Sequence, residues 1–262
     1  MNILDTIIAK KRAEVERTKL TKSVADLEKG PFFKNETLSF AASLLRTDKT
    51  GIIAEFKRRS PSRGAINEFS SVTEVTKAYT KYGASAISIL TDNEFFGGSL
   101  ADLLEATVNE IPLLRKDFMI DEYQLIESKA FGAEVILLIA SCLSLEESKH
   151  LAAFAKNIGL NVLLEIHSED QLEYISEDID VVGVNNRDLK TFIVDVNHSV
   201  RLAGKIPKNK IKISESGIDN VETIKLLRDN GYNGFLVGEK FMRENEPGQA
   251  FKNFSDALME QK

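Results

Sequence analysis

Short apolar runs alternate with amphipathic stretches along the chain from residue 51 onward. The eight runs lie at residues 52–57, 86–91, 112–117, 134–140, 161–166, 180–185, 210–215 and 234–238. Because they are apolar throughout rather than alternating with polar residues, we expect strands buried on both faces, as in a parallel sheet covered by helices.

Start and stop signals frame the predicted helices between these runs. Side chains that can cap a helix precede several of them, at Ser71…Glu74, Ser144…Glu147 and Ser168…Gln171, with close variants at Asp121…Gln124 and Asp219…Glu222. Glycines that can take a left-handed backbone follow them, at Gly83, Gly132, Gly159, Gly204 and Gly231. These signals satisfy free N–H groups at helix starts and let the chain turn at helix ends.

Eight strand–helix units in about 210 residues are the number and length expected for a (β/α)₈ barrel, known as a TIM barrel. A doubly wound open sheet is the rival α/β fold. It would carry a glycine-rich dinucleotide loop after its first strand, and residues 58–64 are not such a loop. The pattern therefore favours the barrel.

Some fifty residues precede the first run. Ile3, Leu4, Ile7, Ile8 and Val15 recur at helical spacing, and residues 39–45 predict a second short helix. We expect one domain over residues 1–262, with residues 1–50 as a helical extension packed on the barrel. We further expect the first helix and the loop 58–70 to cover the rim at the carboxyl ends of the strands. The alternative is that this helix closes the opposite end.

Composition narrows the class of protein. The chain has 262 residues, 43% hydrophobic and 28% charged, with a net charge of −6 and basic residues spread along it. This argues against a nucleic-acid partner. The single Cys142 rules out an internal disulfide and suits a reducing cytoplasm. No apolar run is long enough to span a membrane, and no secretory signal begins the chain. We expect a cytoplasmic monomer.

Charged side chains gather where the predicted strands end, which is where barrels carry their chemistry. Glu55 and Lys57 are two residues apart and so point to the same side of a strand. Later strand ends carry Lys116, Glu165, Asn185 with Arg187, and Glu215. Each alone can be a structural ion pair, but so many buried charges are costly to keep as structure only.

The last two strands end in glycines. Ser216-Gly217 and Gly238-Glu239 lie in the loops that often hold a phosphate in this fold, and residues 241–243 can form the accompanying short helix. By contrast, His150, His167 and His198 lack metal-ligand spacing, and we expect surface or helix positions for them. The pattern therefore predicts a phosphate site and no metal centre.

These residues together resemble the indole-3-glycerol phosphate synthase family. The resemblance is carried by residues 55–62, 90–92 with 95–99, 114–118, 164–165, 183–189, 215–217 and 236–239. It runs in order over nearly the whole chain and includes the amphipathic extension. Some members have serine where Glu239 stands, so the resemblance assigns no role to that side chain.

The resemblance implies an enzyme of tryptophan biosynthesis without a cofactor. The implied reaction closes the indole ring of 1-(2-carboxyphenylamino)-1-deoxyribulose 5-phosphate and releases carbon dioxide and water. Lys116 would be the acid of ring closure, Glu165 the late base, and Lys57 a carboxylate contact or second acid. Glu55 and Asn185 would orient these groups. Substrate contacts would be Ser62, Phe96, Phe118, Arg187, Glu215, Ser216, Gly217, Gly238 and the backbone of Glu239.

Two other functions fit parts of the pattern. A phosphoribosylanthranilate isomerase would lack the long extension and use a Cys/Asp pair, whereas Cys142 does not stand at an expected strand end. A non-catalytic phosphometabolite-binding barrel would have no need of Lys57, Lys116 and Glu165 together.

Overall fold

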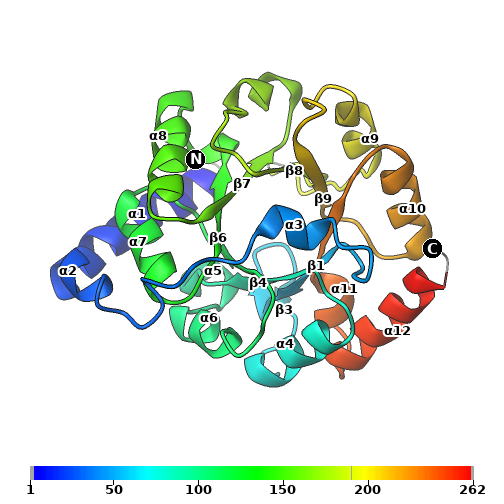
Figure 1. The fold of residues 1–262 in the computed structure, drawn as a ribbon, viewed down its shortest axis with the longest axis horizontal. Helices are drawn as coiled ribbons and strands as arrows, with labels where there is room; N and C mark the ends of the chain where they lie inside the picture. Colours follow the sequence, from blue (N-terminus) through cyan, green and yellow to red (C-terminus); the bar gives the residue numbers. More distant parts are fainter. Residues whose placement is uncertain (1–2, 190, 261–262) are drawn as a thin grey trace.

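Eight parallel strands close into a barrel within the part of the chain that the computed structural model describes, residues 3–189 and 191–260 (Figure 1). In order around the ring they are β1 (Ile52–Phe56), β4 (Ala86–Leu90), β5 (Leu113–Lys116), β6 (Val135–Ile139), β7 (Asn161–Ile166), β8 (Val181–Asn185), β9 (Ile211–Glu215) and β10 (Gly234–Val237). The eight apolar runs are these eight strands, and the predicted TIM barrel is confirmed.

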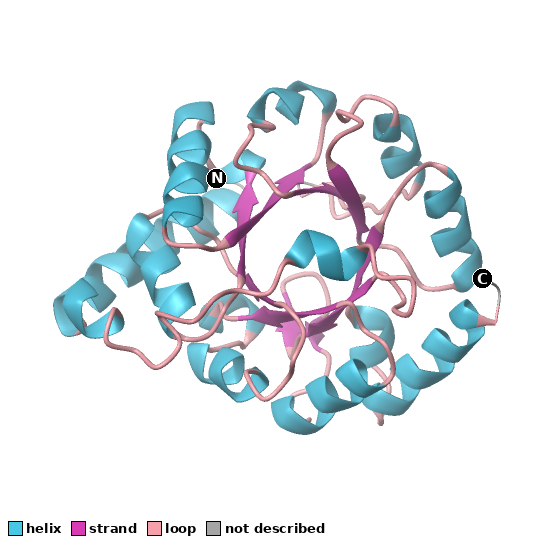
Figure 2. Ribbon diagram, in the orientation of Figure 1, coloured by secondary structure: helices cyan, strands magenta, loops and turns pink. Residues whose placement is uncertain are grey.

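Helices surround the ring of strands (Figure 2). They are α4 (Val72–Lys81), α6 (Leu100–Ala106), α7 (Glu122–Ala130), α8 (Leu145–Asn157), α9 (Asn197–Ala203), α10 (Val221–Asp229) and α12 (Pro247–Met259). Shorter turns lie in the loops: α5 (Asn93–Phe96), α11 (Glu239–Met242) and the 3₁₀ helices η1 (Ala140–Cys142) and η2 (Glu169–Tyr174). The first loop forms a small hairpin of β2 (Arg59–Ser60) and β3 (Gly64–Ala65).

Most of the predicted helix signals act as caps. The Ser71 and Asp121 side chains accept backbone N–H groups at the starts of α4 and α7. At Ser144 both halves of the capping box are present, because the Glu147 side chain also accepts the Ser144 N–H group. These caps explain why α4, α7 and α8 begin where the sequence predicts.

Three of the signals were wrong. Ser168 precedes the 3₁₀ helix η2 and makes no capping hydrogen bond, since the Gln171 side chain instead accepts the N–H of His167. α10 is capped by Asn220 rather than Asp219. Gly204 keeps a right-handed backbone, with φ of −77°.

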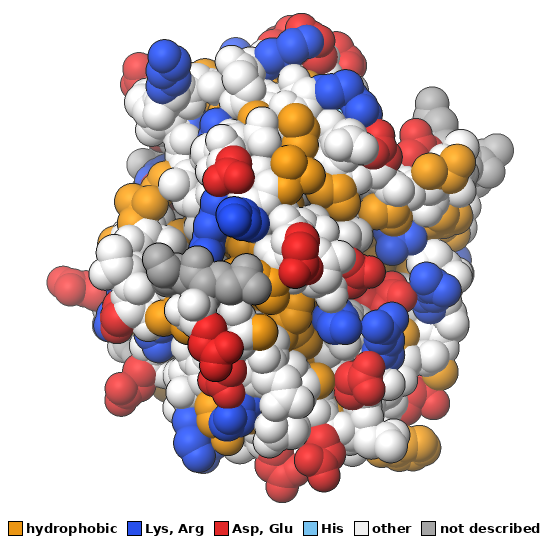
Figure 3. Space-filling view, turned by 90° about the vertical axis from the view of Figure 1, so that its right-hand side faces the viewer, with side chains coloured by type: hydrophobic (Ala, Val, Ile, Leu, Met, Phe, Trp, Pro, Cys, Tyr) orange, Lys and Arg blue, Asp and Glu red, His pale blue; other side chains and the backbone are white. Residues whose placement is uncertain are grey.

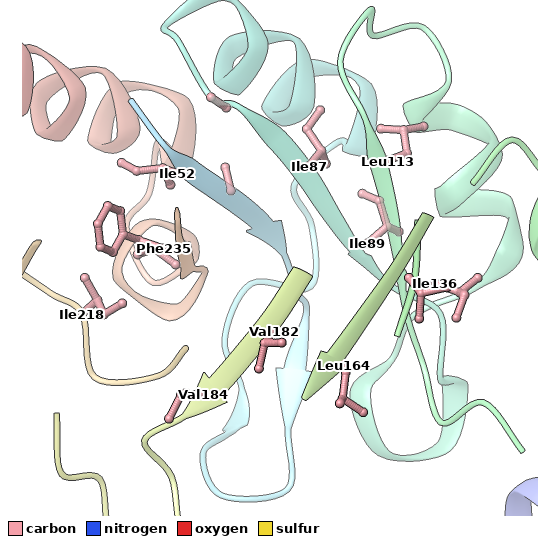
Figure 4. Close-up of a cluster of buried hydrophobic side chains, with 14 of the residues drawn as sticks. Ile52, Ile87, Ile89, Leu113, Ile136, Leu164, Val182, Val184, Ile218 and Phe235 are labelled. Carbon is pink, nitrogen blue, oxygen red and sulfur yellow. The ribbon is translucent and has the colours of Figure 1, made fainter. Parts of the chain in front are cut away.

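Two apolar layers hold the barrel together. One lies between strands and helices and includes Ile52, Ile87 and Leu113 (Figure 4). The other fills the barrel interior and includes Ile53, Leu114 and other residues of the alternate register. Because successive residues of a strand face opposite sides, strands between two such layers must be apolar throughout.

The extension covers the two ends of the barrel with different helices. The side chains of α3 (Phe40–Leu44) pack into the interior layer, and the Phe40 N–H donates to Asn161 at the start of β7. In Figure 1, α3 accordingly lies across the centre of the ring. α1 (Ile3–Thr21) lies at the other end, where Ile3, Leu4 and Ile7 line a cavity with the strand-end residues. The predicted rim position of the first helix is confirmed, and α3 is the element that closes the opposite end.

Between α1 and α3 in the sequence, α2 (Val24–Leu27) packs beside α7.

On the side of the molecule formed by α10 and α12, acidic and basic side chains are interspersed rather than segregated (Figure 3). No helix within residues 3–189 and 191–260 is both long and apolar enough to cross a membrane.

Replacing Phe40 by alanine tests the closing role of α3. The ring is fully buried, so Phe40→Ala should lower the free energy of unfolding by about 3–5 kcal/mol, because it leaves a cavity under the barrel. Denaturant unfolding measures this loss. Leu45→Ala is the control, since Leu45 is 54% exposed and should cost little. An unchanged stability with lost activity would contradict the assignment.

Candidate active site

A cavity of about 400 Å³ opens at the carboxyl ends of the barrel strands. This size suits a small-molecule ligand. All fourteen residues that the sequence singled out line it: Glu55, Lys57, Ser62, Phe96, Lys116, Phe118, Glu165, Asn185, Arg187, Glu215, Ser216, Gly217, Gly238 and Glu239. The barrel thus brings these residues together from seven of its eight strands and the loops that follow them, and β6 also lines the same space.

The floor of the cavity carries a cluster of charges. Lys116 at the end of β5 lies 2.9 Å from Glu165 of β7 and 3.7 Å from Glu215 of β9. Lys57, just after β1, lies 2.6 Å from Glu55. Asn185 at the end of β8 donates to the other oxygen of Glu165, at 3.1 Å. All three carboxylates are buried, so the cluster is shielded from water on its strand side.

These neighbours set the protonation of the cluster. Burial alone would lower the pKa of the Lys116 ammonium, but the carboxylates of Glu165, Glu215 and Glu55 raise it. Burial alone would raise the pKa of Glu165, but Lys116 and His167 hold it well below its usual range. For Glu215 burial dominates, and the nearby Glu165 carboxylate adds to it, so its pKa is raised. Lys116 is therefore charged and Glu165 ionised at neutral pH.

One wall of the cavity is aromatic and apolar. The rings of Phe96 and Phe118 lie side by side with their centroids 6.2 Å apart and their planes tilted by 42°. Leu137 and Ile139 of β6 add aliphatic surface from the barrel, and the first turns of α1 add more. A flat aromatic group can lie against this wall.

The opposite wall is built from the loops after β9 and β10. Ser216 and Gly217 both take a left-handed backbone, with φ of 68° and 75°. A Cβ at Gly238 would lie 2.8 Å from the Cβ of Glu55, so glycine is needed there for packing against β1. α11 begins at Glu239, with Gly238 as its N-cap, two residues before the predicted 241–243 helix.

The side chain of Glu239 is turned into an ion pair at the rim. It lies 3.1 Å from Arg63 of the first loop and 4.0 Å from Arg187. Its negative charge is therefore offset by two guanidinium groups. The predicted phosphate site therefore does not have an unpaired carboxylate beside it.

Comparison with known proteins agrees with this geometry. The family model for indole-3-glycerol phosphate synthase matches residues 4–254. A protein of that name from Bacteroides thetaiotaomicron is 48% identical over 258 residues, which cover 98% of this chain and 99% of the relative. Another from Salinibacter ruber is 42% identical over 254 residues, covering 95% and 94%. The chain belongs to the indole-3-glycerol phosphate synthase family.

Solved structures show the fold that this family shares with another enzyme. The tryptophan synthase alpha subunit of Legionella pneumophila superimposes with a TM-score of 0.62 at 13% identity, covering 85% of this chain and 98% of that one. The Pyrococcus furiosus tryptophan synthase complex gives 0.58 at 15% identity, with 81% and 99% covered. At this identity the likeness concerns the barrel alone.

Membership of the indole-3-glycerol phosphate synthase family makes the chain an enzyme of tryptophan biosynthesis, a lyase that releases carbon dioxide during ring closure. Of the three functions that the sequence pattern allowed, the isomerase and the non-catalytic barrel are thereby set aside.

Two of the sequence interpretations near the site need correction. His167 is neither a surface nor a helix residue: it directly follows β7, and its ring lies 3.2 Å from Glu165. Glu165 and His167 share a strand face by the same period-two argument that linked Glu55 to Lys57, so the signal was present. Cys142, in the turn just after β6, does follow a strand end; burial raises the pKa of its thiol to about 12, so it stays protonated.

Lys11 is a second residue that the sequence did not single out. Its side chain is only 1% exposed, and its ammonium lies 3.0 Å from both Asp92 and Asp117. Asp92 caps α5, which carries Phe96, and Asp117 accepts the N–H of Phe118. One ammonium on α1 therefore links the rim helix to both aromatic segments of the cavity wall.

Replacing Lys11 by methionine should loosen this wall. We expect KM to rise about tenfold, equivalent to roughly 1.4 kcal/mol of lost binding, with kcat nearly unchanged, because the reacting groups stay in place. Steady-state kinetics measure both constants. Lys10→Met is the matched control, since Lys10 pairs with Glu94 of α5 at 3.1 Å but in solvent, where such a pair contributes little. Equal effects of the two substitutions would contradict the linking role.

Proposed function

We propose that the cavity binds 1-(2-carboxyphenylamino)-1-deoxyribulose 5-phosphate and that Lys116 is the acid that starts its conversion to indole-3-glycerol phosphate. The proposal depends most on one observation, the charged Lys116–Glu165 pair set between an aromatic wall and a glycine-rich loop wall. An anthranilate ring and a phosphate at opposite ends of a short sugar chain match these two walls.

Ring closure needs an acid at the ribulose carbonyl. The ring carbon that bears the carboxylate attacks the carbonyl carbon, a C–C bond forms, and the carbonyl oxygen takes a proton from Lys116. The pairing that keeps Lys116 charged supplies this proton at neutral pH. Lys57 holds the substrate carboxylate until it leaves as carbon dioxide, which returns the bonding electrons to the ring.

Loss of water then completes the indole. The new hydroxyl departs with a proton supplied by a lysine, and Glu165 removes the proton from the neighbouring carbon so that the double bond forms. The ionised state of Glu165 suits this role as a base. Atoms and electrons balance without an added cofactor, and we propose that none takes part.

The remaining polar residues orient these groups. Glu55 and Asn185 hold Lys57 and Glu165 by direct contacts. Arg187, whose guanidinium reaches the rim, contacts the substrate or the Glu239 carboxylate. We propose that Glu215 keeps its proton and so can donate to a sugar hydroxyl, which its raised pKa favours.

The phosphate binds across the loops after β9 and β10, with Ser62 of the first loop completing the site. Ser216, Gly217 and Gly238 offer backbone N–H groups and a hydroxyl, which suit phosphate oxygens. Arg63 lies on the same side of the cavity and adds positive charge.

We propose that residues 1–50 and the barrel act as one domain, with α1 and the loop 58–70 excluding water from the bound substrate. Their contribution to the cavity lining supports this arrangement. We further propose that the enzyme works as a cytoplasmic monomer on a free phosphorylated metabolite, with no nucleic-acid or membrane partner. The mixed charge on the face formed by α10 and α12 and the overall charge of −6 favour this view.

Substitution of Lys116 tests the proposed function directly. Lys116→Met keeps the length of the side chain and removes the acid, so turnover of the carboxyphenylamino-deoxyribulose phosphate, followed by indole fluorescence, should fall by about 10²–10⁴-fold. Circular dichroism checks that the barrel folds. A folded variant that keeps more than half of the wild-type rate would remove Lys116 from the mechanism.

Substitution of Ser216 tests the phosphate end. A phosphate contact is the same in the ground and transition states, so Ser216→Ala should raise KM several-fold and leave kcat close to the wild-type value. Inhibition by inorganic phosphate should weaken in parallel. A fall in kcat with unchanged KM would place Ser216 at the reacting centre instead.

A further inference from the structure

His167 is the one ionisable ring beside the Glu165 carboxylate in the described part of the chain. Its Nε2 atom lies 3.2 Å from Glu165 Oε1, and its Nδ1 atom lies 3.3 Å from the Ser141 hydroxyl of η1. The ring is 11% exposed, and Nε2 is fully buried without a hydrogen bond of good geometry. A buried polar atom in that state calls for an explanation.

A chain of hydrogen bonds favours one position for the proton of the neutral ring. The backbone N–H of His167 donates to Gln171 Oε1 at 2.7 Å, which fixes the orientation of that amide. The amide nitrogen of Gln171 then donates to Ser141 Oγ at 2.9 Å. The hydroxyl of Ser141, which accepts this N–H group, has its own hydrogen available to donate to Nδ1 at 3.3 Å. With Nδ1 as an acceptor, a neutral ring has its proton on Nε2, facing Glu165.

We propose that His167 is a positioning residue for Glu165, and that the Gln171–Ser141 pair holds its ring in the Nε2–H form for this purpose. The proposal rests on the role of Glu165 as the late base. Nε2–H and the Asn185 amide approach one oxygen of the carboxylate, while Lys116 holds the other. The carboxylate is thereby kept ionised and in one rotamer when it must accept a carbon-bound proton.

Several charged or titratable groups face Glu165 besides His167. They are Lys116 from β5, Glu215 from β9 and, more distantly, Cys142 from η1. His198 of α9 lies near His167, and burial lowers its pKa, so it adds no charge at neutral pH. Removing the His167 donor therefore leaves a carboxylate beside another carboxyl group, with Lys116 as its main charged partner. The pKa of Glu165 should then rise, because the ionised form loses a stabilising contact.

The pH dependence of kcat separates positioning from simple packing. A base is active in its ionised form, so a raised pKa moves the acidic limb of the profile to higher pH. For His167→Leu we expect kcat to fall about 10–100-fold, the effect of losing one donor to a charged group. The acidic limb should move upward by about one unit. His167→Gln places an amide N–H near the Nε2 position. It should therefore restore most of kcat and return the acidic limb close to its wild-type pH.

The matched control is His150→Leu. His150 also pairs with a glutamate, Glu122, at 2.7 Å, but on the surface. This substitution should leave kcat and the profile unchanged. A folded His167→Leu variant with lower stability but an unmoved acidic limb would overturn the proposal, because the ring would then only fill space.

The ring proton can also be observed without any activity. The chain has three histidines, so ¹⁵N-labelled imidazoles can be assigned by substitution. At neutral pH the His167 resonances should report Nε2–H, and Ser141→Ala should shift the ring toward Nδ1–H while moving the acidic limb of kcat as His167→Leu does. An Nδ1–H form in the wild-type enzyme would overturn the proposal, even if His167→Leu fails to fold.

Failure of the underlying mechanism would look different. If Glu165→Gln keeps more than half of the wild-type rate, Glu165 is not the base and the proposed function is wrong at that step, whatever the ring tautomer. If Glu165→Gln is inactive and His167→Leu has the wild-type rate and profile, the mechanism stands and the positioning role is wrong.

Discussion

The buried ion pair between Lys116 and Glu165 is the interaction on which the site depends. Two lysines and three glutamates meet at the carboxyl ends of the strands, where burial makes each unpaired charge costly. The raised pKa of Glu215 favours its neutral form, which reduces the excess of negative charge around the two lysines. The cluster can therefore stay buried, and its central lysine stays charged and its base ionised.

The extension before the barrel covers both of its ends. α3 closes the amino-terminal end of the barrel with buried apolar side chains, and this packing stabilises the fold. α1 lies over the open end and is held there by Lys11, which concerns the ligand. One segment thus separates two tasks that a bare barrel leaves to its loops.

The comparison with tryptophan synthase alpha subunits illustrates how function is distributed in this fold. At 13–15% identity the barrel is shared, so the eight strands and their covering helices are compatible with very different sequences. What places this chain in its own family is the sequence match to the family model over residues 4–254. Function resides in sites rather than in the fold that holds them.

The sequence by itself determined the barrel and most of the candidate site, because both follow from local periodicity. Apolar runs of strand length, separated by capped helices, leave few topologies open, and residues at the ends of parallel strands must meet at one edge. Glu55 and Lys57 were paired by alternation alone. The same rule applied to Glu165 places His167 on the same side of β7. The spacing of the histidines was compared only with that of metal ligands, so this pairing was not predicted.

What only the tertiary structure decided are the contacts between distant segments. Nothing local links Lys11 to Asp92 and Asp117, more than eighty residues away, and a lysine in an amphipathic helix ordinarily faces solvent. The division of the extension between the two barrel ends depends on which apolar surface each helix meets. Likewise the predicted capping box at Ser168 does not form, and the Gln171 side chain instead accepts the backbone N–H of His167. Periodicity fixes the side of an element on which a residue lies, whereas its partner is set by packing.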